Sequence, residues 1–212
     1  RKMMEKFPEA KIQKQPDWYG FEGICQLDPL DPLFTELGKA FLEEEQKLYG
    51  TYGLYAADPF HESKPPVDTP EYLNAVGSSI HKLKTFAPDA LWVMQAWSFR
   101  KDIASVVPKH DLLVLSLNGA LGGEDHFCNH DFVVGNLHNF GGRVNLHGDL
   151  PLVSSNQFMK AKQETPNVVG SGLFMESIGQ NPVFYELAFE MPVHQDSVKL
   201  KEWLDKYAQR RY

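Results

Sequence analysis

The sequence predicts an α/β fold: a partial (β/α)8 barrel of the TIM type, followed by the beginning of an α-helical domain. Three observations favour this fold. Short apolar runs alternate with segments of helical periodicity, several runs are apolar at consecutive positions, and loops rich in glycine or aromatic residues follow their ends. No G-x-G-x-x-G sequence opens a helix and no phosphate-binding glycine loop occurs, which argues against a simple doubly wound sheet.

Six segments are predicted as strands. Consecutive apolar residues are typical of a parallel strand that is covered on both faces, and turn or cap residues bound most of the runs. The predicted strands are residues 11–14, 54–58, 91–97, 112–117, 132–137 and 168–175.

Helix starts are predicted where a capping residue precedes an apolar periodicity. The clearest start is Asp31-Pro32, because proline fits the first turn of a helix. Phe34 and Leu37 follow at helical spacing, and Gly50 ends the segment. The remaining starts are Thr69-Pro70, Asn181-Pro182 and Asp196.

Composition and length bound the class of protein. The 212 residues are 42% hydrophobic and 23% charged, which is typical of a globular chain with a sizeable core. The formal net charge of −7 and the lack of a basic cluster argue against a nucleic-acid partner. No apolar run is long enough for a membrane span, no signal peptide is visible, and two cysteines are too few for a disulfide scaffold.

The predicted barrel is short. A complete (β/α)8 barrel usually takes about 250 residues, whereas the barrel-like part covers residues 1–180. We therefore expect the chain to begin inside a barrel and residues 181–212 to begin a helical domain. An incomplete barrel leaves strand edges unpaired, so self-association through these edges is expected.

Two glutamates follow predicted strands and are candidate catalytic residues. Glu62 lies in a loop stiffened by prolines after 54–58, and Glu176 ends the run 168–175. Two carboxylates at one pocket are what glycoside hydrolysis requires, one as acid and one as nucleophile or base. The alternatives are a solvated loop residue for Glu62, and a helix cap or ion pair for Glu176.

Aromatic and polar residues after other strands suit a sugar. Trp97 offers a flat apolar face for a sugar ring, and Asn139 offers both donors and an acceptor. The alternatives are an ordinary core or rim aromatic and a structural turn. A weaker alternative function is a zinc-dependent hydrolase that uses His126, Cys128 and His130 on one side of an extended loop.

Four motifs occur in a common order: residues 54–62 with the following Pro65-Pro66, 94–99, 137–142 and 170–181. In this order they resemble the α-N-acetylglucosaminidases, the family of the lysosomal heparan-degrading enzyme and its bacterial relatives. The resemblance runs from about Phe7 to Tyr212, and the segment from Glu176 to Leu187 is its most specific part. His61 stands where animal relatives carry asparagine, and bacterial members are more similar here.

The resemblance implies a retaining exo-glycosidase that releases terminal α-linked N-acetylglucosamine, with Glu62 as general acid/base and Glu176 as nucleophile. It implies a glycan partner, no cofactor, no metal, and a secreted, periplasmic or lysosomal location. An alternative is a fragment that binds carbohydrate without cleaving it. The implied substrate-binding residues are His61, Trp97, His138, Asn139 and Tyr185.

Overall fold

The computed structural model describes residues 2–142 and 148–211. The chain forms two compact units. The first unit comprises Arg1–Met94 and Ser98–Leu112, and the second comprises Gln95–Trp97 and Leu113–Tyr212. None of the helices in the described ranges is both long and apolar enough to cross a membrane.

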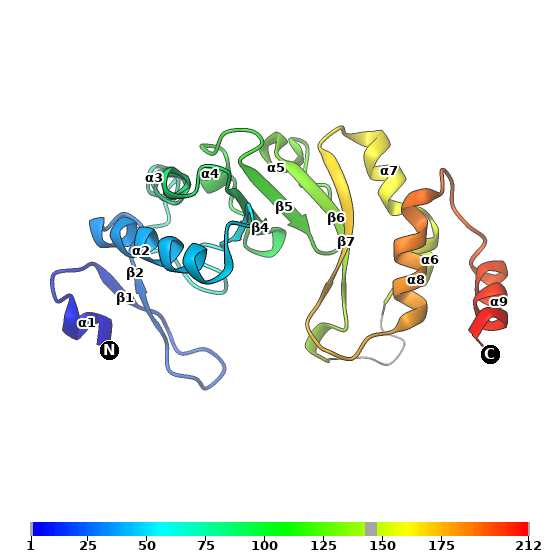
Figure 1. Ribbon diagram of the computed structural model, residues 1–212, viewed down its shortest axis with the longest axis horizontal. Helices are drawn as coiled ribbons and strands as arrows, with labels where there is room; N and C mark the ends of the chain where they lie inside the picture. Colours follow the sequence, from blue (N-terminus) through cyan, green and yellow to red (C-terminus); the bar gives the residue numbers. More distant parts are fainter. Residues whose placement is uncertain (1, 143–147, 212) are drawn as a thin grey trace. The chain divides into compact units, whose positions relative to one another are not determined.

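The first unit combines a small antiparallel hairpin with a pair of parallel strands and their helices (Figure 1). Its elements are α1 (Lys2–Lys6), β1 (Ile12–Lys14), β2 (Cys25–Leu27), α2 (Pro32–Tyr49), β3 (Leu54–Ala56), α3 (Pro70–Lys82), η1 (Leu83–Phe86), β4 (Leu91–Gln95) and α4 (Lys101–Ala104). β3 and β4 are parallel, with Leu54 opposite Leu91. This pairing confirms that 54–58 and 91–97 contain parallel strands.

The caps of α2 and α3 confirm the helix starts predicted in this unit. The carboxylate of Asp31 accepts hydrogen bonds from the backbone N–H of Leu33 at 2.9 Å and of Lys11 at 2.8 Å. Thr69 caps α3 by accepting from the Tyr72 N–H at 3.4 Å. Gly50 follows α2 with a φ of 81°, a conformation that glycine adopts without steric cost.

The prediction for residues 11–14 needs a correction. The strand exists, but β1 pairs antiparallel with β2, with Gln13 opposite Gln26, and belongs to a separate two-stranded sheet. The described residues therefore contain seven strands rather than six. β2 is not among the predicted strands.

The second unit is built on three parallel strands. Its elements are β5 (Leu112–Ser116), α5 (His126–Asn129), β6 (Asp131–His138), η3 (Phe140–Gly142), α6 (Leu150–Ser154), α7 (Gln157–Glu164), β7 (Val168–Met175), α8 (Pro182–Glu190), η4 (Met191–Val193) and α9 (Leu200–Arg211). β6 lies between β5 and β7 and pairs parallel with both. The predicted strands 112–117, 132–137 and 168–175 are confirmed, as is the helix start at Asn181-Pro182. The helix predicted to start at Asp196 begins only at Leu200.

A close approach between β6 and β7 explains one glycine in the middle of β6. A Cβ atom on Gly135 would lie 2.4 Å from the ring of Phe174 and 2.5 Å from the carbonyl oxygen of Gly172. No side chain fits at such distances, so glycine permits the register of the two strands.

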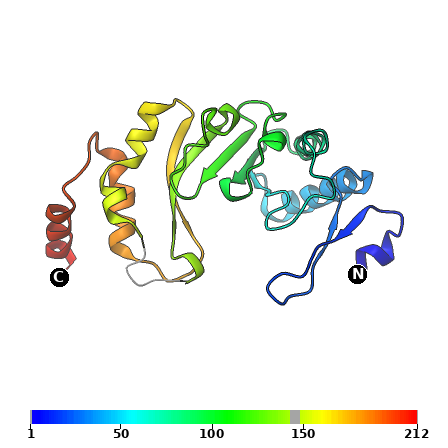
Figure 2. The same cartoon turned by 180° about the vertical axis from the view of Figure 1, so that it is seen from behind.

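The core of the second unit lies where α8 packs against α6. Phe184 and Leu187 of α8 are buried with Val153, Met191 and Trp203. α6, α7 and α8 lie together beside β7, and both views show this arrangement (Figures 1 and 2). Burial of two such side chains stabilises the unit by roughly 3–6 kcal/mol, so α8 is held firmly at the end of the segment that follows β7.

The open strand edges generate a prediction. Within the described chain, β3 pairs with β4 alone and β7 with β6 alone, so each presents one edge of unpaired backbone groups. We expect the isolated chain to form dimers or larger species, because such edges pair with other chains. Light scattering on the purified chain checks this, and a stable monomer of 24.1 kDa would contradict it.

Candidate active site

The first acidic loop follows β3 and carries Glu62, whose side chain is exposed. Phe60, 4% exposed, anchors this loop in the core. Phe60 and Glu62 have φ values of 58° and 50°, which are strained conformations for residues other than glycine. His61 is also exposed, and its backbone N–H donates to the carbonyl oxygen of Asp58 at 3.3 Å.

A buried glutamine holds this loop from the β1–β2 hairpin. The amide nitrogen of Gln15 donates to the carbonyl oxygen of Lys64 at 3.0 Å, and its amide oxygen accepts from the Lys64 N–H at 3.2 Å. The same nitrogen donates to Oε1 of Gln26 at 2.9 Å. Gln15 was not predicted as a site residue. It is a polar residue next to a proline, and no local pattern indicates that its partner lies 49 positions away in the sequence.

The second acidic loop follows β7 and carries Glu176, which is also exposed. Oε2 of this carboxylate accepts the N–H of Gly141 at 2.7 Å. A backbone donor of this kind fixes the orientation of the carboxylate. The loop after β6 thus supplies a hydrogen-bond donor to the carboxylate of Glu176, which follows β7.

Asn139 lies beneath this acidic loop and is completely buried. Its Oδ1 accepts the N–H of Glu176 at 3.1 Å, and its Nδ2 donates to the carbonyl oxygens of Ser177, at 3.1 Å, and Gly179. The backbone φ of Asn139 is 47°, a left-handed conformation that asparagine tolerates better than most residues. The amide of Asn139 therefore faces the protein's own backbone.

Two further predicted residues form a ring cluster in the second unit. The fully buried ring of His138 stacks on Phe184 at a centroid distance of 4.7 Å and meets Tyr185 edge-on at 5.2 Å. Burial raises the pKa of Tyr185, so its hydroxyl stays protonated at neutral pH. That hydroxyl is buried and has no hydrogen-bond partner in the part of the chain that the structure describes.

The predicted residues divide between the two units. Glu62 and His61 belong to the first unit. The second unit brings Glu176 together with Asn139, and His138 together with Tyr185. Trp97 follows β4 in η2 (Ala96–Ser98) and is 63% exposed, which leaves its ring face available to a ligand.

The expectation of an extended loop at 126–130 is wrong. His126, Phe127, Cys128 and Asn129 all have φ between 46° and 60°, so they form a tight left-handed turn. Among the residues that the structure describes, no group of three histidine, cysteine or acidic side chains is placed to hold a metal ion. The geometry therefore gives no support to the alternative in which His126, Cys128 and His130 bind zinc.

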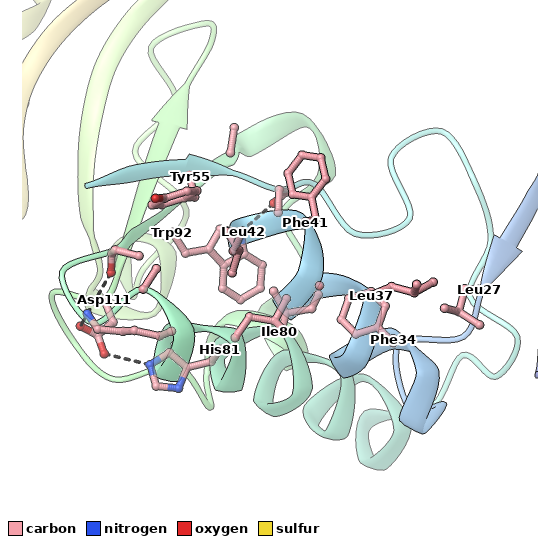
Figure 3. A pocket seen from close by; sticks show the side chains of 17 residues that line it. Leu27, Phe34, Leu37, Phe41, Leu42, Tyr55, Ile80, His81, Trp92 and Asp111 are labelled. Atoms are coloured by element: carbon pink, nitrogen blue, oxygen red, sulfur yellow. Dashed lines mark hydrogen bonds and ion pairs between the residues drawn. The ribbon is translucent and has the colours of Figure 1, made fainter. Parts of the chain in front are cut away.

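A separate cavity of about 390 Å³ lies within the first unit, between α2, α3 and the strand pair (Figure 3). Its walls are apolar, as the labelled Phe34, Leu37 and Trp92 illustrate, and α2 has no fully buried residue. None of the predicted site residues lines it. One edge is polar: Asp111 accepts from Lys84 at 2.6 Å and contacts His81 at 2.8 Å.

The family of the chain follows from comparison with known proteins. The model for the "Alpha-N-acetylglucosaminidase (NAGLU) tim-barrel domain" matches residues 1–195. The chain belongs to the α-N-acetylglucosaminidase family. Its parallel strands are therefore part of the TIM-barrel domain of that family, and the domain boundary at residue 180 stays a prediction.

Relatives of the α-N-acetylglucosaminidase family agree with this. The chain is 33% identical to the human α-N-acetylglucosaminidase over 97% of its own length and 31% of that protein. It is similar to a family 89 glycoside hydrolase from Clostridium perfringens in complex with PUGNAc, with a TM-score of 0.85 and 26% identity. The chain is fully covered in that comparison and spans 25% of the bacterial chain.

A second structure of the bacterial enzyme is informative about the ligand. It is a variant in which two glutamates are replaced by glutamine, in complex with its substrate GlcNAc-α-1,4-galactose. The TM-score to this structure is 0.86, at 25% identity. The chain thus covers about a quarter to a third of these relatives.

The Asp111 cluster generates a prediction on stability. The hydrogen bond from Lys84, followed by that from His81, lowers the pKa of Asp111. A carboxylate with a lowered pKa stabilises the fold above its unfolded pKa of about 4, and this contribution is lost as the pH falls through the folded-state pKa. We expect Asp111→Asn to reduce the free energy of unfolding at pH 7 by about 1–3 kcal/mol, and this difference to shrink below about pH 4.

Urea titrations of both proteins across this pH range measure the effect. A difference between wild type and variant that is the same at all pH values would show that the charge of Asp111 does not contribute.

Proposed function

We propose that this chain carries the catalytic carboxylates of a retaining exo-α-N-acetylglucosaminidase, with Glu176 as nucleophile and Glu62 as general acid/base. The observation that carries the proposal is the state of Glu176 at the carboxyl end of β7. It is exposed, oriented through one oxygen by the Gly141 N–H, and its other oxygen has no hydrogen bond within the described chain. An oriented carboxylate with one oxygen available is suited to attack on a sugar carbon.

The reaction follows from these roles. Glu62 donates its proton to the glycosidic oxygen while a carboxylate oxygen of Glu176 attacks the anomeric carbon, so the bond to the leaving group breaks and a glycosyl-enzyme ester forms. Glu62, now ionised, takes a proton from water, which attacks the same carbon and releases Glu176. Two inversions at one carbon retain its configuration.

The substrate pocket is proposed from exposure. Trp97 and His61 have exposed side chains, so they are the predicted residues best able to contact a sugar directly. His138 is completely buried and Tyr185 partly buried, so we assign them to the wall behind the pocket. The complex of the bacterial relative with GlcNAc-α-1,4-galactose supports a glycan that ends in α-linked N-acetylglucosamine.

Substitution of the two glutamates tests the proposal. Glu62→Gln and Glu176→Gln are assayed in the longest polypeptide in which this chain occurs, with Glu164→Gln on the exposed surface of α7 as the matched control. Loss of acid–base or nucleophilic catalysis costs a factor of about 100 or more in kcat/KM, so both site variants are expected to fall at least this far while the control stays near wild type.

The leaving group distinguishes the two roles. The aryl group of an activated aryl N-acetylglucosaminide leaves without much protonation, so the defect of Glu62→Gln should shrink on it compared with a disaccharide in which galactose is the leaving group. The defect of Glu176→Gln should persist on both substrates. Near-normal turnover in either variant would refute the assignment. Sugar binding in calorimetry without any wild-type turnover would favour the alternative, a carbohydrate-binding fragment.

A further inference from the structure

We propose that Gln15 and Asn139 are positioning residues, two buried amides that each hold one of the catalytic glutamates in place. The inference rests on the proposed function and adds two residues to its machinery. It assigns a role to Gln15, which is not among the candidate residues predicted from the sequence. It also assigns Asn139 to support of the acidic loop, in place of contact with the sugar.

The Glu62 loop needs an external support. Phe60 and Glu62 both lie in the left-handed region, and residues of this kind cost of order 1–3 kcal/mol each unless their surroundings hold them. Gln15, which is 5% exposed, supplies such a support from another element by pairing with both the N–H and the carbonyl oxygen of Lys64. Ser63 adds a hydrogen bond to Gln26, the residue that Gln15 also contacts.

The Glu176 loop is held in the same way. The Asn139 amide pairs with the N–H of Glu176 and with two carbonyl oxygens further along the loop, so it bridges residues 176–179. Asn139 also precedes Gly141 by two positions, and Gly141 holds the Glu176 carboxylate itself. One short segment therefore fixes both the backbone and the carboxylate of the nucleophile.

We call the hydrogen bonds of Gln15 to Lys64 and of Asn139 to residues 176–179 the two clamps. Both require an amide side chain. Each side chain donates from its nitrogen to a backbone carbonyl oxygen and accepts with its oxygen from a backbone N–H. Neither a carboxylate nor a hydrocarbon reproduces this combination. Loss of the side chain leaves backbone groups without partners, and the loop then moves to satisfy them. A displacement of about 1 Å at a catalytic group costs about 100-fold in rate.

The test uses one deletion variant for each clamp, and each variant serves as the control for the other. Gln15→Ala removes the first amide. Asn139→Gly removes the second and keeps a residue that tolerates a positive φ. Gln15→Glu and Asn139→Asp are the conservative versions, and Gln163→Glu on exposed α7 controls for the change in charge.

Amide hydrogen exchange measures the protection of the Lys64 and Glu176 backbone N–H groups, independently of enzyme activity. Gln15→Ala should speed exchange at Lys64 and leave Glu176 unchanged, because only the Lys64 N–H donates to Gln15. Asn139→Gly should speed exchange at Glu176 and leave Lys64 unchanged. Unchanged exchange at both amides would overturn the clamps, whatever the enzyme does.

Steady-state kinetics test whether the two amides position the catalytic glutamates. We expect kcat to fall by about 100-fold in each deletion variant with KM nearly unchanged, in the same polypeptide used for the glutamate variants. The defect of Gln15→Ala should shrink on an activated aryl glycoside, as for Glu62→Gln, and that of Asn139→Gly should persist on both substrates.

Equal losses on both substrates in both variants, accompanied by equal falls in thermal midpoint, would show a merely structural role. A wild-type enzyme with no turnover would instead defeat the proposed function, while the exchange data would still decide the clamps.

Discussion

The hydrogen bond from the Gly141 backbone to the Glu176 carboxylate is the interaction on which the candidate site of the second unit depends. A parallel strand ends by releasing the chain at the edge of the sheet, where side chains are exposed and loops are free to vary. A carboxylate at that point becomes useful only when a neighbouring element fixes it. Here the neighbour is the loop after β6, and the parallel pairing of β6 with β7 brings the two together.

The register of β6 and β7 also helps to place the loops that form this site. His138 lies opposite Met175, so the residues that follow each strand begin at the same level. Gly135 allows the close approach of the two strands, and the burial of His138 against Phe184 ties α8 to the end of β6. Packing of an apolar core thus determines where a polar, exposed carboxylate is placed.

Local signals in the sequence predicted much of this fold. Apolar runs identified the parallel strands, and Asp31 and Thr69 identified helix starts because their side chains satisfy the first free N–H groups. The motif order identified the family, and the position of Glu176 after a strand identified an acidic loop.

Other features could not be predicted because they depend on contacts between distant residues. Gln15 acquires its role only when the hairpin folds against Lys64. The left-handed turn at His126–Asn129 replaced an expected extended loop, since backbone conformation there is set by the Asp125 side chain, which accepts from the Cys128 N–H, and by the buried Phe127. Asn139 was identified as a candidate by its position after a strand, but only the structure shows that its amide faces the backbone.

As the proposed nucleophile, Glu176 forms a covalent bond with the sugar. The most direct measurement is peptide mapping by mass spectrometry after incubation with a fluorinated α-N-acetylglucosaminide that reacts quickly and is released slowly. We expect one added sugar, located on the peptide that contains Glu176. A sugar attached to another residue, or turnover of the reagent with inverted configuration and no adduct, would contradict it.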